Sequence, residues 1–170
     1  EEHGAESVRI LEPLLKDVLG DIWPSFAEAV KYHSFKDTPG KDAFASEFGW
    51  PLCALLRDLD KAGGFAKAEA YVGEDKERQA RTNGLACWSD DNPTAETGTI
   101  ETAEGMPDVL VAFLREETVV RAHCASYEAY MLQLLGWLYD FNTDEVFQKV
   151  MTDGHPAIVL TYLKDCLLYT

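Results

Sequence analysis

Histidine and cysteine are the most chemically versatile residues of this chain, but their spacing does not bring them together. His123 and Cys124 form the only adjacent pair of these two types. Neighbouring residues of a helix project about 100° apart and do not face one another. A thiolate–imidazole pair is therefore not expected, and the sequence names no catalytic residue.

A second candidate for chemistry is the segment Asp140-Phe-Asn-Thr-Asp144, which begins like a calcium-binding EF-hand loop. Such a loop needs a glycine at its sixth position and a glutamate at its twelfth. Glu145 and Met151 stand at those places. We therefore expect no metal site in this segment.

Motifs that cradle phosphates, activate a serine or bind a catalytic zinc ion are missing from the sequence. It holds no G-x-G-x-x-G, Walker, G-x-S-x-G or H-E-x-x-H pattern. We therefore expect no cofactor, and the sequence favours an interaction role over an enzymatic one.

The four cysteines are spaced too widely for a metal or redox motif. Cys53, Cys87, Cys124 and Cys166 lie more than thirty residues apart, each among apolar residues. A free cysteine behaves as a small buried hydrophobe. Unpaired thiols fit a reducing compartment, so the sequence predicts a cytoplasmic or nuclear protein.

The charge balance points to the kind of partner. Thirty acidic against fifteen basic residues give a formal net charge of −15. Such a field repels nucleic acid and anionic membranes and favours a basic protein or peptide. No stretch is apolar enough to cross a membrane. Because the chain does not begin with methionine, we interpret it as a processed form or a part of a larger protein.

Apolar residues recur at helical spacing through most of the chain, which predicts an all-α fold. In the first helix Val8, Leu11, Leu15 and Val18 form one apolar stripe that Ile10 and Leu14 widen, as is typical of an amphipathic helix. Residues 62–64 (Ala-Gly-Gly) are expected to break the chain's fourth helix. The predicted helices are 5–19, 25–35, 42–48, 51–61, 65–72, 76–88, 107–115, 118–139, 144–151 and 156–169.

One segment differs in composition from the rest. Residues 89–104 are rich in acids, threonine and small polar residues, with Ile100 as the only large apolar residue. This composition predicts an exposed acidic loop inserted into a single domain of residues 1–170.

Four prolines introduce apolar segments at intervals. Pro13, Pro51, Pro107 and Pro156 are separated by 38, 56 and 49 residues. Removing the loop at 89–104 brings the middle spacing into the range of helical repeats. The segments at 104–117 and 153–165 resemble armadillo and HEAT repeats. This resemblance implies an irregular stack of about three to four helical units. The alternative is a non-repeating helical bundle.

A stack of this kind buries each unit against its neighbours and presents a curved surface, which in the armadillo family binds peptides. In the helix at 118–139, His123, Tyr130 and Trp137 fall seven residues apart, with Gln133 between them. Aromatic, imidazole and amide groups in one line suit a peptide-binding groove. The alternative is that these aromatic rings pack against a neighbouring helix.

A matching line in the preceding unit would contain Arg81 and Trp88. Trp88 and Asn92 have the W-x-x-x-N spacing with which armadillo importins hold a peptide backbone. Here Pro93 follows the asparagine, which places Asn92 beyond the end of the helix. The spacing alone therefore leaves coincidence as the simpler interpretation.

Three functions remain open. The first is an interaction module, a scaffold or peptide-binding helical domain with a basic partner. The second is a helical-bundle enzyme or small-ligand carrier with an aromatic-lined pocket. The third is a homo-oligomer that joins through an exposed apolar end formed by Val159, Tyr162, Leu163 and Leu167.

Overall fold

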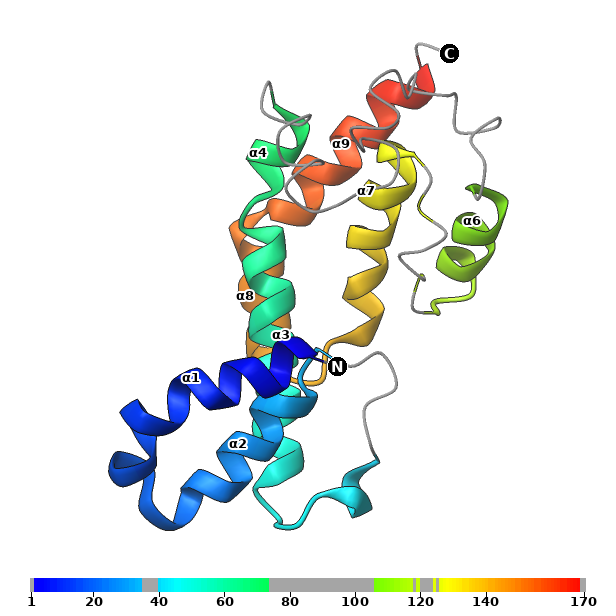
Figure 1. Ribbon diagram of the computed structural model, residues 1–170. Coiled ribbons are helices and arrows are strands. Elements are labelled where there is room, and N and C mark those ends of the chain that lie inside the picture. Colours follow the sequence, from blue (N-terminus) through cyan, green and yellow to red (C-terminus); the bar gives the residue numbers. More distant parts are fainter. Residues whose placement is uncertain are drawn as a thin grey trace. The chain divides into compact units, whose positions relative to one another are not determined.

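Helices are the only regular elements in the part of the chain that the computed structural model describes, which confirms the expected all-α fold. The described residues are 2–34, 40–73, 106–117, 119, 124 and 126–168 (Figure 1). The predicted helix 76–88 and the predicted loop 89–104 lie outside them. The chain divides into two compact units, unit 1 (1–60) and unit 2 (61–170).

Unit 1 is built from an antiparallel helix pair and most of the helix that follows it. Its elements are α1 (Glu2–Leu19), the 3-10 turn η1 (Gly20–Ile22), α2 (Trp23–Tyr32), the 3-10 turn η2 (Lys41–Ala43) and α3 (Gly49–Phe65) as far as residue 60. Gly20 has a φ of 51°, a left-handed conformation that glycine adopts at little cost, and it ends α1. The start of α1 therefore returns to the end of α2, where the His3 and His33 rings lie 5.8 Å apart.

The core of unit 1 is small. Ala29, Phe44 and Cys53 form its buried cluster, and Tyr32 and Trp50 are among the half-buried residues packed against them. The Phe44 ring meets both of these rings nearly edge-on, at centroid distances of 5.9 Å. A core of this size leaves much of the apolar surface of α1 without a partner inside the unit.

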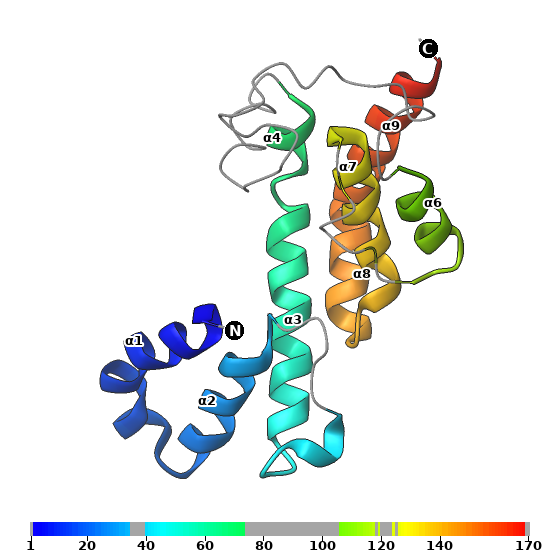
Figure 2. The same ribbon diagram turned by 45° about the vertical axis from the view of Figure 1, so that its right-hand side comes forward.

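Unit 2 surrounds one central helix. Its elements are the end of α3 from Lys61, α4 (Ala68–Val72), α6 (Met106–Leu114), α7 (Tyr127–Gly136), the 3-10 turn η5 (Trp137–Asp140), α8 (Asp144–Asp153) and α9 (His155–Leu168). α7 lies between α6 and α9, and α4 packs against α9 (Figures 1 and 2). Gly154, with a φ of 78°, makes the turn that joins α8 to α9.

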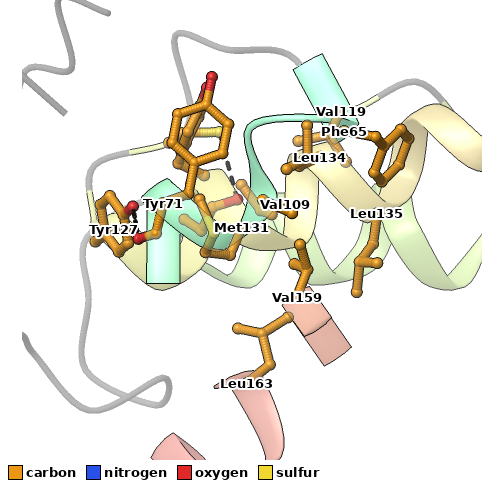
Figure 3. Close-up of a cluster of buried hydrophobic side chains, with 14 of the residues drawn as sticks. Phe65, Tyr71, Val109, Val119, Tyr127, Met131, Leu134, Leu135, Val159 and Leu163 are labelled. Carbon is orange, nitrogen blue, oxygen red and sulfur yellow. Dashed lines mark hydrogen bonds between the residues drawn. The ribbon is translucent and has the colours of Figure 1, made fainter. Parts of the chain in front are cut away.

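The core of unit 2 is formed mainly by residues of α7. Met131 and Leu134 are fully buried there, and Val109 of α6 and Val159 of α9 pack against the same cluster. Figure 3 shows Tyr71 and Tyr127 at one end of this cluster and Phe65 with Leu135 at the other. A helix with almost no solvent-facing side is held by packing rather than by its own propensity.

Three of the four prolines lie where a helix tolerates them. Pro51, Pro107 and Pro156 stand in the first turn of α3, α6 and α9, where their missing N–H leaves no hydrogen bond unmade. Pro13 differs, because it lies in the interior of α1, which continues through it to Leu19.

The glycine pair in α3 does not end the helix, so the predicted break at 62–64 is wrong. A Cβ on Gly64 would lie 2.6 Å from Cζ3 of Trp137, whereas one on Gly63 would meet nothing within 4 Å. Gly64 therefore permits the Trp137 ring to lie against α3, and tertiary packing outweighs the low helix propensity of the pair.

The predicted helix 118–139 is too long at its N-terminal end. Glu117, Val119, Cys124 and Ser126 are not helical, and α7 begins at Tyr127. The Ser126 hydroxyl accepts a hydrogen bond of 3.1 Å from the backbone N–H of Ala129. A serine in this position satisfies an N–H that the helix itself leaves unpaired, which fixes the helix start.

The predicted helix 42–48 is also wrong. Residues 41–43 form only the turn η2, and Phe44 follows in an extended conformation with φ −82° and ψ 137°. This conformation brings the Phe44 ring into the small core of unit 1. Burial of this aromatic side chain stabilises the unit more than a short helix at 42–48 would.

Gly4 is the residue of α1 on which its packing against α2 should depend most. A Cβ there would lie 2.2 Å from the backbone oxygen of Lys31, which cannot move without shifting α2. We expect Gly4→Ala to lower the free energy of unfolding by about 1–3 kcal/mol, the usual range for overpacking. Urea denaturation followed by far-UV circular dichroism measures this change.

Gly63→Ala is the matched control. Gly63 lies in the interior of α3 with open space around its Cα, so alanine should raise the stability by about 0.5–1 kcal/mol through helix propensity. If both variants shift the midpoint in the same direction, close approach of α1 to α2 is not what Gly4 provides.

Candidate functional site

The residues predicted to line a peptide groove are divided between the core of unit 2 and parts of the chain outside the description. Arg81, Trp88 and His123 lie outside the described residues. Tyr130 is 3% exposed and Gln133 is 5% exposed. Contact of these two side chains with a partner would require unit 2 to open.

The contacts of Tyr130 and Gln133 account for their burial. The Tyr130 ring meets Tyr71 edge-on at 5.8 Å, and the side-chain amide of Gln133 donates to the backbone oxygen of Val119 at 3.2 Å. Trp137 is half-buried and lies edge-on to Phe65 at 6.4 Å. The described part of the predicted line thus packs within unit 2, as the alternative interpretation of the sequence proposed.

The predicted apolar end for self-association is also largely internal. Val159 is fully buried and Leu163 is 6% exposed, and both pack against α7. Tyr162 is half-buried, and the side chain of Leu167 lies outside the description. The buried residues of α9 therefore serve the core of unit 2.

Lys61 is a buried cation that joins the end of α3 to η5. Its ammonium nitrogen lies 3.0 Å from Oδ2 of Asp140, donates to the Asp140 backbone oxygen, and stands 5.4 Å from the Phe141 ring centroid. A buried charge is tolerated only where such partners replace water. Because Lys61 is satisfied within the fold, it is a structural residue.

A cluster of four tyrosines lies at the other end of α7, and one of them, Tyr162, contacts a buried acid. This tyrosine cluster comprises Tyr71, Tyr127, Tyr130 and Tyr162, whose rings contact one another at centroid distances of 5.8–6.2 Å. The Tyr127 hydroxyl donates to the backbone oxygen of Tyr71, which ties α7 to α4 (Figure 3).

Glu128 is the acid beside the tyrosine cluster. It is 4% exposed, and its Oε1 accepts a long hydrogen bond of 3.5 Å from the Tyr162 hydroxyl. Its Oε2 has no hydrogen-bond partner. The sequence carried a signal for this residue, because Glu128 is the one charged side chain in the apolar run from Tyr127 to Leu132.

Tyr162 connects this buried acid to the surface. It lines a depression of about 430 Å³ together with Val72 of α4 and Ala157, Ile158, Thr161 and Asp165 of α9. Burial, followed by the charge of Glu128, raises the pKa of Tyr162 above its ordinary value of 10. The hydroxyl therefore keeps its proton and can donate to Glu128.

The largest departure from the sequence-based interpretation is on α1. Val18 was expected to belong to a single apolar stripe that Ile10 and Leu14 widen, yet Ile10, Leu14 and Val18 are 56%, 66% and 78% exposed. Leu11 and Leu15, one position further along, are half-buried instead. We call Ile10, Leu14, Val18 and Ile22 of η1 the apolar row.

Several kinds of site are missing from the described residues. No group of three or more His, Cys, Asp or Glu side chains in these ranges could hold a metal ion. No helix among them has the length and apolar character needed to cross a membrane. Cys53 and Cys124 are buried free thiols, as predicted, and Cys166 is half-buried.

Comparison with known proteins adds no relative. No family model, no curated protein and no solved structure matches this chain. The geometry of the described residues offers two candidate sites. One is the apolar row of unit 1, and the other is Glu128 with the tyrosine cluster of unit 2.

The buried ion pair of Lys61 should contribute more to stability than an exposed pair of the same type. Lys61→Met keeps the aliphatic stem but leaves Asp140 without its cation, so we expect a loss of about 2–3 kcal/mol of unfolding free energy. Lys149→Met breaks the exposed pair with Asp153 and should cost no more than about 0.5 kcal/mol. Equal losses in urea denaturation would show that burial adds nothing to the Lys61 pair.

The raised pKa of Tyr162 predicts that the stability of the protein depends on pH in the alkaline range. Unfolded Tyr162 loses its proton near its ordinary pKa of 10, whereas folded Tyr162 holds it to higher pH. The free energy of unfolding should therefore fall as pH rises above about 10, because the unfolded state binds fewer protons there. Urea denaturation over this pH range should show that the free energy of unfolding falls less in Tyr162→Phe than in the parent protein. An equal decrease in both proteins contradicts the prediction.

Proposed function

We propose that this protein is an interaction module that binds a basic amphipathic helix along the apolar row of unit 1. The observation that carries the proposal is the exposure of three large aliphatic side chains at four-residue spacing on α1 and of a fourth in the turn that follows it. Ile10, Leu14, Val18 and Ile22 are all more than half exposed. Single exposed apolar residues are ordinary, but a continuous row is typical of a binding surface.

The distribution of exposed apolar side chains favours unit 1 over unit 2. Among the described residues, seven of the twelve large hydrophobic ones that are exposed belong to unit 1, although it is the smaller unit. Six of the described apolar residues are buried in unit 1, against fifteen in unit 2. A partner that covers the row would supply the apolar burial that unit 1 lacks by itself.

The spacing of the row indicates a helical partner. Ile10, Leu14 and Val18 lie four residues apart on α1, and side chains at this spacing form a ridge on a helix. The half-buried residues Leu11, Leu15 and Leu19 form a second ridge beside it. A partner helix can place a ridge of its own between them, which is the commonest mode of helix packing in globular proteins.

The charges beside the row indicate that the partner is basic. Asp17 and Asp21 are exposed and directly precede Val18 and Ile22. The two basic residues of α1, Arg9 and Lys16, are bound to Glu6 and Glu12 at 2.6 and 2.8 Å. Unit 1 holds twelve acidic and six basic residues, a formal net charge of −6. Complementary charge speeds association and selects the partner.

The test uses a synthetic helical peptide with leucines on one face and lysines on the other. We expect it to bind the full chain in fluorescence anisotropy, and added salt to weaken the complex. Leu14→Ala/Val18→Ala should weaken binding about tenfold or more, because each buried methylene contributes about 0.8 kcal/mol. The stability of the variant should change little, since both side chains are exposed.

Val111→Ala/Leu114→Ala is the matched control. It removes the same two side-chain types from α6 of unit 2, where they are 46% and 77% exposed, and should leave binding unchanged. A peptide with glutamate in place of lysine should not bind. Equal weakening by both double variants would mean that the peptide adheres to any acidic surface, and the proposal would fail.

A further inference from the structure

We propose that unit 2 has a second binding site, in which Glu128 and the tyrosine cluster bind an alkylammonium group that enters through the depression lined by Tyr162. This site lies in a different unit from the apolar row and goes beyond the proposed interaction with a helix. The two proposals can therefore fail independently.

The bare oxygen of Glu128 is the first argument. A buried carboxylate must be compensated by a cation or by hydrogen bonds to both oxygens. Oε1 has only the 3.5 Å bond from Tyr162, and Oε2 has no partner. Among the described residues no lysine, arginine or histidine forms an ion pair with Glu128. The position of Glu128 in the first turn of α7 favours its negative charge but supplies no hydrogen bond to Oε2.

Tyr162, which contacts Glu128, and the Tyr127 ring packed against it indicate the class of cation. Tyr127 and Tyr162 meet at right angles with their centroids 6.1 Å apart. Faces of tyrosine rings attract ammonium groups, most strongly where water is excluded. A carboxylate oxygen and an aromatic wall together suit an ammonium nitrogen that carries both N–H donors and carbon substituents.

The depression provides the route and the place for the alkyl part. Val72, Ala157 and Ile158 give it apolar walls, and Asp165 adds a second negative charge at the exposed surface. Tyr162 both lines the depression and contacts Glu128. An ammonium N–H that replaces the long Tyr162 bond would form a hydrogen bond in which donor and acceptor are both charged, whereas the tyrosine donor is neutral.

The test follows tyrosine ring signals by NMR in the full chain during titration with n-butylammonium chloride. We expect saturable shifts of the Tyr162 and Tyr127 signals, and none with sodium chloride or n-butanol at equal concentration. Glu128→Gln keeps the shape of the side chain but removes its charge, and should weaken binding about tenfold or more. Unchanged signals of Tyr71 and Tyr130 in that variant would show that the core is intact.

Tyr162→Phe separates the role of the ring from that of the hydroxyl. It keeps the aromatic wall and removes the group that competes for Glu128, so binding should be as tight or tighter, with Tyr127 as the reporter. Shifts that do not saturate, or a Glu128→Gln variant that binds like the parent, would overturn the proposal.

A further arm of the titration identifies the source of the ammonium group. N-acetyl-lysine N-methylamide carries the same group on a peptide-like backbone. Binding of both probes would mean that the site accepts a lysine side chain of a polypeptide. Binding of n-butylammonium alone would mean that it accepts a free amine.

Discussion

Burial of α7 on nearly every side is the constraint on which unit 2 depends, because such a helix is stable only where other elements cover it. α6 and α9 flank it, and η5 continues from its end. The ion pair of Lys61 with Asp140 and the contact of Gly64 with Trp137 hold the end of α3 against that turn. Each of these contacts serves to enclose the same helix, so unit 2 has one continuous core.

Enclosing α7 also determines which polar groups are left without partners. Gln133 donates to Val119, yet its own Oε1 and the Oε2 of Glu128 make no hydrogen bond. A fold optimised only for stability would replace such groups by apolar ones of similar size. Burying Glu128 without a partner costs more free energy than burying the Gln133 oxygen, because Glu128 is ionisable. A ligand that pairs with Glu128 would offset this cost.

Unit 1 presents the opposite situation. Its core is small, and its longest helix carries apolar side chains on two adjacent rows, of which only one packs inward. This exposed apolar surface beside acidic residues is the basis of the proposed association with a basic helix. The two proposed ligands thus belong to different units, a helix on the surface of unit 1 and a small cationic group near the core of unit 2.

The sequence by itself determined the all-α class and several helix bounds, because periodicity and capping are local properties. Helices 107–115, 144–151 and 156–169 agree closely with α6, α8 and α9. Only the tertiary structure decided which side of α1 is covered and that Tyr130 and Gln133 are buried. It also let α3 pass through Gly63 and Gly64 and left Oε2 of Glu128 without a hydrogen-bond partner. Periodicity shows that a helix has an apolar face, but which residues of that face meet a neighbour depends on contacts between segments far apart in the chain.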